Sequence, residues 1–280
     1  MIIRPPQKPL LGSLINWGHP LAKYLQKGFI FNERSGLTLR PYLGRHGTNA
    51  PLTKRWGNPT WKPEGLYLDD NGHGTENDVM ETSFSISNSR SFTFFTTITL
   101  KGAPYANSSG AYIFSNDVTR GYMYAHIRND AGYEYCIESV VGQNDGHRHE
   151  GINPNRVYLD IPFTFAVVGR HATNTAFNYV NGTVLELTQI SAGWAGASDI
   201  FSSVYYLGEF FENWKDYYGL DGIIHHFYLF NKAFSQNELD ELRSNPYAMF
   251  EQPRKRWFYV AAGGGLSIPV AMADYRQMRN

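Results

Sequence analysis

The segment 219–246 constrains the fold of this chain more than any other. A turn glycine leads into the apolar run 223–230, which is long enough for one strand buried on both faces. Ser235 follows, and Glu238 stands three residues later, the spacing of a capping box that begins a helix. Pro246 ends that helix, because the residue before a proline avoids helical geometry. The chain is therefore expected to close on a buried strand followed by one short helix.

Short apolar or alternating runs recur through the rest of the chain, separated by clusters of turn-forming residues. The dipeptide Asn181-Gly182 lies between two such runs and is the strongest hairpin signal in the sequence. Many short strands with a single convincing helix favour one all-β sandwich or barrel domain. The expected strands are 28–32, 65–69, 91–100, 111–115, 122–127, 133–141, 163–169, 176–180, 184–187, 204–209 and 223–230.

Six segments also match, in order and spacing, the motifs of a known family. They are 14–22, 28–33, 46–48, 66–72, 91–94 and the closing segment 219–246. Together they resemble concanavalin A-like, laminin-G-type jelly-roll domains in the form common in tailed bacteriophages. The resemblance covers residues 14–250. It implies an all-β, two-sheet antiparallel jelly-roll sandwich with one short C-terminal helix and extended N- and C-terminal segments.

The two ends of the chain differ from the domain between them. Residues 1–13 are rich in proline, which is excluded from helix interiors and central strands, and we interpret them as an arm. The tail, 251–280, begins with a basic cluster and continues as an apolar run that glycines and a proline interrupt, too short for a bilayer span. We predict an assembly tail that packs on this chain, on a neighbouring subunit or on a larger assembly. Its contact residues are predicted to be Arg254, Arg256, Trp257, Phe258 and Tyr259.

Composition limits the class of partner and the compartment. The net charge is zero at neutral pH, so the whole-chain field gives no case for nucleic acid or an anionic membrane. Cys136 is the single cysteine, so no internal disulfide can form, and the first residues hold no apolar run of signal-peptide length. We expect synthesis in a reducing cytoplasm. A virion protein released by lysis reconciles this with a fold that usually acts outside cells.

Glycan hydrolysis is the enzymatic possibility for such a fold. Retaining hydrolases need two carboxyl groups about 5 Å apart across the scissile bond. Carboxylates at alternate strand positions share a face, yet the chain has no Glu-x-Asp-x-x-Glu or similar cluster. We therefore predict that the protein is not an enzyme and has no catalytic residues.

Calcium is the ion that the resemblance implies, bound by loop oxygens. The candidate ligands are Asp69, Asp70 and Asn71 with Asp78, or the pair Asn144-Asp145, although solvated turn acids explain the same residues. The chain departs from the family where the closing strand normally carries two adjacent acids. Here it has His225-His226, and imidazoles suit transition metals better than calcium. No other cofactor is predicted.

Aromatic side chains gather in two segments that are expected to be loops. Glycan sites place aromatic rings beside polar groups, and both occur in these segments. The same aromatics would also serve at a protein interface, which we favour. The candidate ligand or interface residues are Trp194, Phe210, Phe211, Trp214, Tyr217 and Tyr218.

From the resemblance we predict a bacteriophage virion structural protein on the particle surface, a capsid decoration or head-fibre protein that binds rather than catalyses. Its partners would be capsid or other virion proteins and further copies of itself, and it would be synthesised in the host cytoplasm. The alternative is a glycan-binding adhesin of a tail or fibre that recognises host surface carbohydrate.

Overall fold

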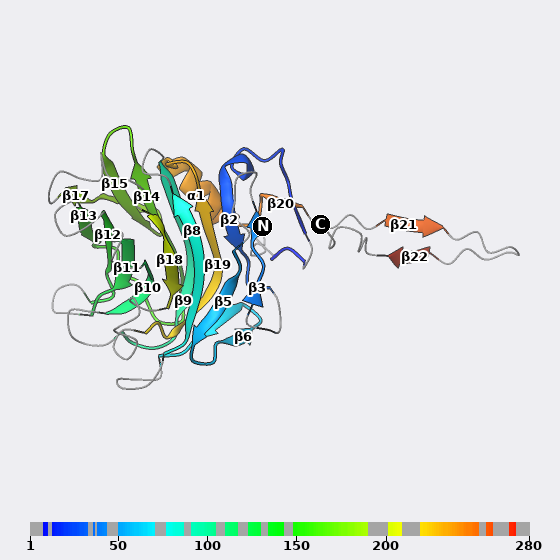
Figure 1. The fold of residues 1–280 in the computed structure, drawn as a ribbon, viewed down its shortest axis with the longest axis horizontal. Coiled ribbons are helices and arrows are strands. Elements are labelled where there is room, and N and C mark those ends of the chain that lie inside the picture. The colour runs from blue at the N-terminus through cyan, green and yellow to red at the C-terminus, as the bar shows by residue number, and fades with distance from the viewer. Residues whose placement is uncertain are drawn as a thin grey trace, which may run out of the picture.

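The chain folds into two large antiparallel sheets packed face to face, with one short helix (Figure 1). This confirms the predicted all-β, two-sheet sandwich. The structure, a computed structural model, describes residues 8–10, 13–32, 36, 38–43, 50–70, 77–86, 91–104, 110–116, 123–129, 134–142, 148–189, 201–208, 219–251, 256–259 and 269–272.

The first sheet has β10 at its centre and is called the β10 sheet. Every neighbouring pair of its strands is antiparallel. In spatial order its strands are β17 (Thr188–Gln189), β13 (Arg148–Asn153), β12 (Ile137–Gly142), β11 (Met123–Ile127), β10 (Ala111–Asn116), β18 (Phe201–Leu207), β8 (Val79–Ile86), β5 (Leu52–Trp56) and β3 (Thr38–Leu39).

The second sheet is organised around β19 and is called the β19 sheet. Strand β19 is the apolar run predicted near the end of the domain, and it pairs with β9 along its whole length. The main path of this sheet is β16 (Thr183–Glu186), β15 (Thr175–Val180), β14 (Pro162–Arg170), β9 (Phe92–Leu100), β19 (Gly222–Phe230), β2 (Leu25–Phe29) and β4 (Tyr42–Leu43). Off this path, β7 (Gly65–Leu68) pairs with both β19 and β6 (Thr60–Lys62).

The main core lies between the two sheets. Phe94 of the β19 sheet stacks against Phe114 of the β10 sheet, with ring centroids 5.1 Å apart. Phe227 joins the same group at 5.6 Å from Phe94. All three side chains are buried, together with residues at alternate positions along the facing strands. Burial of these aromatic and branched side chains removes apolar surface from water and holds the sheets together.

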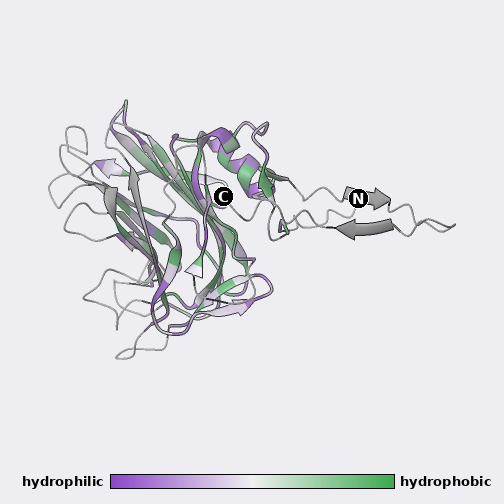
Figure 2. Ribbon diagram, turned by 45° about the vertical axis from the view of Figure 1, so that its right-hand side comes forward, coloured by the Kyte–Doolittle hydropathy of each residue, from purple (hydrophilic) through white to green (hydrophobic). Residues whose placement is uncertain are grey.

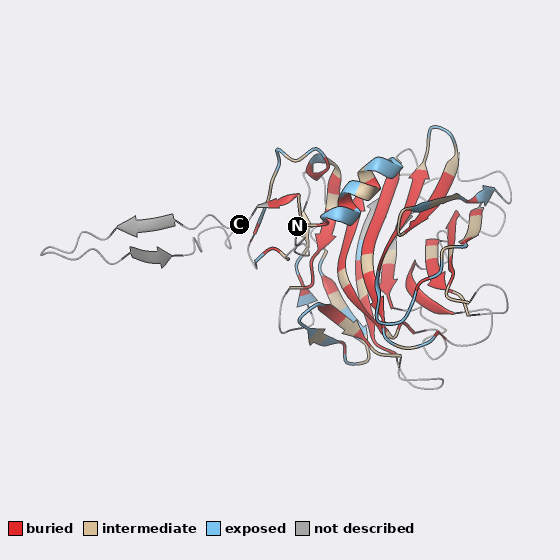
Figure 3. Ribbon diagram, turned by 180° about the vertical axis from the view of Figure 1, so that it is seen from behind, coloured by how far each residue is buried: buried red, intermediate tan, exposed pale blue. Residues whose placement is uncertain are grey.

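A second apolar cluster covers the outer face of the β19 sheet. Helix α1 (Gln236–Ser244) begins with the predicted capping box, since Ser235 accepts from the Glu238 amide and Glu238 accepts from the Ser235 amide. Its buried residues Leu239 and Leu242 share a cluster with Tyr228. Figure 2 shows the hydrophilic and hydrophobic faces of the helix, and Figure 3 shows its exposed residues turned away from the sheet. The helix η1 (Ala22–Tyr24) adds to this cover.

The segments near the chain ends take two different courses. On the N-terminal side, the Lys8 ammonium donates to the Phe31 carbonyl, and β1 (Leu14–Ile15) pairs with β20 (Phe250–Glu251). On the C-terminal side, β21 (Arg256–Tyr259) and β22 (Pro269–Met272) pair with each other as a separate two-stranded sheet. The predicted domain boundaries at 13 and 250 stay predictions.

Candidate ligand-binding site

Strand β19 changes its partner halfway along, and the change shapes the surface beside it. Residues 222–224 pair with β7, whereas residues 227–230 pair with β2. The register with β9 shifts between Ile224 and His226, which places His225 in a β-bulge. Bulges re-aim side chains and are frequent beside functional sites. We call residues 222–225 the open half of β19 and residues 226–230 its covered half.

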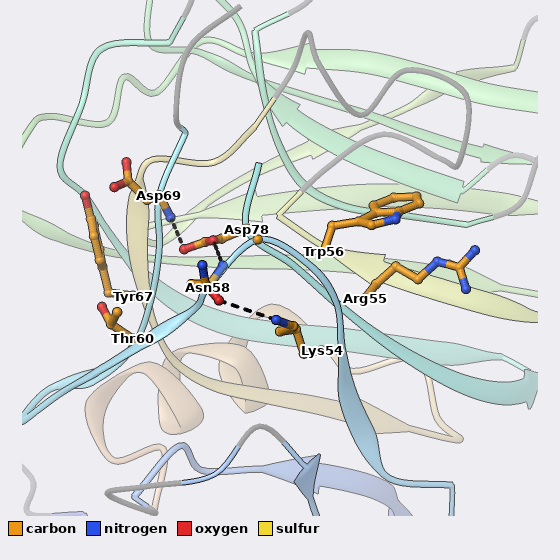
Figure 4. Close-up of a pocket in the computed structure, with 9 residues that line it drawn as sticks. Lys54, Arg55, Trp56, Asn58, Thr60, Tyr67, Asp69 and Asp78 are labelled. Atoms are coloured by element: carbon orange, nitrogen blue, oxygen red, sulfur yellow. Dashed lines mark hydrogen bonds between the residues drawn. The ribbon is translucent and has the colours of Figure 1, made fainter. Parts of the chain in front are cut away.

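Near the open half lies a first hollow, with a volume of about 500 Å³. It sits where β5 of the β10 sheet meets β6 and β7 of the β19 sheet, and its volume is typical of small-molecule sites. Figure 4 shows Tyr67 and Asp69 at one end and Arg55 and Trp56 at the other. The lining residues are Lys54, Arg55, Trp56, Gly57, Asn58, Thr60, Tyr67, Asp69 and Asp78.

Asp78 shapes this hollow. Its two carboxylate oxygens accept from the backbone amides of Asn58, at 2.5 Å, and of Asp69, at 3.0 Å. Burial raises the pKa of the Asp78 carboxyl. Gly57 has a φ of 66°, and a Cβ there would stand 2.1 Å from an Asp78 oxygen, so the turn requires glycine. Asp78 therefore joins three chain segments, with both oxygens engaged.

The Asp69 carboxylate is available in a way that Asp78 is not. The Asp69 backbone amide donates to Asp78. Among the described residues, however, no hydrogen bond or ion pair involves the Asp69 side chain. Lys54, nearby on β5, donates to Asn58 Oδ1 at 3.4 Å. An ammonium has three donors, so two remain for a ligand. The hollow thus presents both an acceptor and donors.

Tyr67 separates the first hollow from a second one of about 580 Å³ and lines both. Its hydroxyl donates to Asp221 Oδ1 at 2.9 Å, and the Lys62 ammonium lies 5.1 Å from its ring centroid. Burial first, and then this bond to Asp221, raise the pKa of the Tyr67 phenol. The second hollow is lined by Lys62, Glu64, Tyr67, Thr99, Lys101, Asp160, Pro162, Ile223 and His225.

His225 contributes a neutral imidazole to the second hollow. Burial lowers its pKa to about 4, so it carries no charge at neutral pH. Its Nε2 lies 2.8 Å from the Thr99 hydroxyl. Lys101 and Asp160, which also line this hollow, form an ion pair at 2.7 Å.

Each hollow is balanced in charge. Two cationic side chains face two carboxyl groups in both, and neither hollow has a net charge of either sign when these groups are ionised. The pairs are Lys54 and Arg55 with Asp69 and Asp78 in the first hollow, and Lys62 and Lys101 with Glu64 and Asp160 in the second.

The two adjacent histidines have separate environments. His226 is fully buried and stacks against Tyr228 at 4.6 Å and Phe95 at 5.5 Å, with Nε2 2.8 Å from the Thr97 hydroxyl. His225, one residue earlier, lines the second hollow. The pair therefore consists of one core histidine and one half-buried histidine that lines a hollow.

The metal prediction is only partly covered by the described residues. Asp69 and Asp70 are described, whereas the candidates outside the described ranges are Asn71, Asn144 and Asp145. Within those ranges, no three His, Cys, Asp or Glu residues come together in a group that could hold a metal ion. The calcium assignment stays a prediction.

The predicted ligand and tail residues are also mostly beyond what the structure describes. Arg256, Trp257, Phe258 and Tyr259 form β21, of which the backbone is described. The residues outside the described ranges are Trp194, Phe210, Phe211, Trp214, Tyr217, Tyr218 and Arg254.

The hollows bring together residues that the sequence did not single out as a site. Tyr67 and Trp56 are the main ones, and Asp221, which is in neither lining, accepts the Tyr67 hydrogen bond. Tyr67 occupies the position between Leu66 and Leu68 in a short strand, the alternation that marks a side chain on the opposite face. That alternation was a usable signal for Tyr67, although it does not identify Asp221 as its partner.

No helix in the described part of the chain is long and apolar enough to cross a bilayer. In sequence, no protein-family model and no curated protein matches this chain.

In structure, the chain is similar to binding domains of botulinum neurotoxins. For the serotype D binding domain the TM-score is 0.57 and the identity 15%, over 80% of this chain and 52% of that one. For the neurotoxin DC binding domain in complex with SialylT the values are 0.55 and 14%, over 79% and 50%. In its complex with rat synaptotagmin II the same domain gives 0.51 and 15%, over 76% and 51%. The chain spans about half the length of these structures, and the likeness is one of fold.

Proposed function

We propose that this protein is a non-catalytic binding protein on the surface of a bacteriophage particle, where it serves as a capsid decoration or head-fibre protein. The sandwich faces outward, and the arm and tail attach it to the capsid or to sister subunits. It is synthesised in the host cytoplasm and is present in several copies per particle. The family resemblance of segments 14–22 and 219–246, among others, supports the virion assignment.

The observation that carries this proposal is the ladder of β21 and β22. These strands pair with each other, and none of the described strand pairings joins them to either large sheet. A two-stranded ladder is at best marginally stable in water by itself. The segment around it is rich in apolar residues. A ladder of this kind gains stability when it docks on another surface, as an anchoring tail would.

A truncated chain ending at residue 252 tests the anchor. The sandwich should remain folded, and the truncated protein should be absent from particles assembled in its presence, whereas the full chain is incorporated. Immunogold electron microscopy with antibody to the 1–252 core then locates the full chain. Label over the head supports decoration, and label at the tail tip supports a fibre. Normal incorporation of the truncated chain would contradict the anchor, and absence of label with a working antibody would contradict the virion assignment.

A second candidate function is recognition of host surface carbohydrate as an adhesin. The two polar hollows beside Tyr67 favour it, because they present hydrogen-bond donors and acceptors in a concave surface. The similar fold of binding domains, one of them solved with SialylT, is also in keeping with a binding role. Both candidates share the essential feature that the protein acts through contact and not through turnover.

A further inference from the structure

We infer that the two hollows beside Tyr67 form one cleft that binds an uncharged oligosaccharide. This rests on the proposed binding function and assigns to it a site and a ligand class. Tyr67 lines both hollows, so a ligand that fills one and passes over this side chain enters the other. The cleft crosses from β5 through β6 and β7 to the open half of β19.

The groups in the cleft match the hydroxyls of a sugar. A hydroxyl donates one hydrogen bond and accepts others, so adjacent hydroxyls are recognised best by an acceptor placed near donors. Asp69 supplies a carboxylate that no described residue engages, and Lys54 retains two donors. The exposed Thr60 hydroxyl lines the same hollow and can do both.

The charge balance of the cleft selects an uncharged ligand. A polyanion such as a sulfated or sialylated glycan is favoured by an excess of positive charge, and a polycation by an excess of negative charge. Each hollow has two of each sign, and His225 adds none at neutral pH because burial lowers its pKa to about 4. A charged ligand would lose its hydration without gaining a complementary field.

An exposed apolar segment, residues 158–161, borders the second hollow and completes the site; we call it the tip. Asp160 and Pro162 line the hollow, and the residues between and before them point large apolar side chains to solvent. Tyr158, Leu159 and Ile161 are 60%, 40% and 56% exposed. Sugar rings have apolar C–H faces that pack against such side chains, aromatic ones above all.

The tip is held in place by the sheet beneath it. The Asp160 amide donates to the Leu100 carbonyl at 2.9 Å, and the Asp160 carboxylate pairs with Lys101. Asp160 has a φ of 59°, the left-handed conformation that reverses the chain at this point. A surface fixed in this way needs little further ordering when it binds.

Isothermal titration calorimetry of the full chain tests the inference, with maltohexaose, cellohexaose and N-acetylchitohexaose as uncharged probes and heparin hexasaccharide and polysialic acid as charged ones. We expect at least one uncharged probe to bind and both charged probes to fail. Asp69→Asn converts one acceptor into a donor and should weaken binding about tenfold or more, and Tyr158→Ala should also weaken it. Glu186→Gln, an exposed change on the edge strand β16, is the matched control and should leave affinity unchanged.

The outcomes separate this inference from the proposed function. Binding of charged probes alone, binding of none, or binding unaffected by Asp69→Asn would each overturn it. Loss of binding in EDTA would overturn it too, in favour of an ion at Asp69. Thermal unfolding of each variant shows whether a loss reflects misfolding, and Tyr158→Ala, on the surface, remains informative if Asp69→Asn is unstable. Particle incorporation is measured separately, so a chain that loads onto particles but binds no sugar rejects the cleft alone.

Discussion

The covered and open halves of β19 show how one strand can serve two purposes. In the covered half, His226, Tyr228 and Phe230 are buried in the cluster that α1 closes or stack within it. In the open half, Ile223 and His225 line the second hollow. The neighbouring strand makes the difference, because β2 accompanies the covered half, whereas the short β6–β7 hairpin accompanies the open half. The covered half contributes stability, and the open half leaves concave polar surface beside a rigid strand.

The comparison predicts that shortening a buried side chain of α1, which covers β19, lowers the free energy of unfolding far more than shortening an exposed side chain beside the open half. Leu239 is fully buried against the covered half, so Leu239→Ala leaves a cavity and should lower the free energy of unfolding by about 2–5 kcal/mol. Leu159→Ala is the matched change at the exposed tip and should cost less than about 0.5 kcal/mol. Urea unfolding measures both. Similar losses in the two variants would show that the tip is packed in solution.

A second prediction concerns the glycines that allow β2 and β7 to approach β19. A Cβ at Gly65 on β7 would stand 2.2 Å from the Ile224 carbonyl oxygen, so Gly65→Ala must push β7 off the open half. A Cβ at Gly28 on β2 would stand 3.0 Å from the Tyr228 ring, which a small side-chain shift can relieve. Gly65→Ala should cost about 1–3 kcal/mol and Gly28→Ala less.

Hydrogen exchange distinguishes local from global damage in these variants. In Gly65→Ala we expect faster exchange in β6 and β7, with protection in the covered half retained. Uniformly faster exchange throughout the β19 sheet would mean that the two halves do not behave independently.

The third prediction is a pH dependence of stability to which the covered half contributes through His226. Burial lowers the pKa of His226 well below its usual value, so the folded chain keeps it neutral while the unfolded chain gains a proton below about pH 6.5. The free energy of unfolding should carry no contribution from this group above that pH. Below it, the His226 contribution should fall by up to about 1.4 kcal/mol per pH unit.

His226→Phe isolates this contribution, because it keeps an aromatic ring between Phe95 and Tyr228. The variant should lose stability less steeply than the native chain as the pH falls, although Thr97 loses its partner at all pH values. His225→Gln is the corresponding change in the open half. His225 has a pKa of about 4 and lines a hollow. This change should therefore also make the free energy of unfolding depend less steeply on pH, but it should leave the packing of α1 on β19 unaltered. Equal slopes in native and His226→Phe chains would contradict a neutral, buried His226.

The sequence predicted correctly those elements that are determined by residues close together in the chain. The apolar run 223–230 became β19, the Ser235–Glu238 spacing became the cap of α1, and Asn181-Gly182 became the turn between β15 and β16. In each case, adjacent residues determine the structure. The number of such signals favoured a sandwich or a barrel, and the two-sheet arrangement was predicted from the family resemblance.

The site could not be reached in the same way, because its residues meet only through tertiary structure. Tyr67 bonds to Asp221, 154 positions away in sequence. The strands that shape the first hollow were not all expected either. Strand β5 lies near an edge of its sheet, and most of its side chains are polar. Its sequence therefore lacks the alternation of apolar and polar residues that predicts a strand. The bulge that separates the two halves of β19 has no signature in the run of apolar residues that contains it.

The smallest predicted effect tests whether the packing of α1 on β19 depends on the N-terminal cap of the helix. The Ser235 hydroxyl accepts from the Glu238 amide, and Ser235→Ala leaves that donor to water, at a cost of about 1 kcal/mol. Ser244→Ala, at the other end of α1, removes only a bond to the Glu241 carbonyl and should cost less. If the cap fixes how α1 lies on β19, Ser235→Ala should also speed hydrogen exchange at Tyr228 and leave β7 unchanged. Unchanged exchange in the covered half would mean that the packing of Leu239 and Leu242 alone positions the helix.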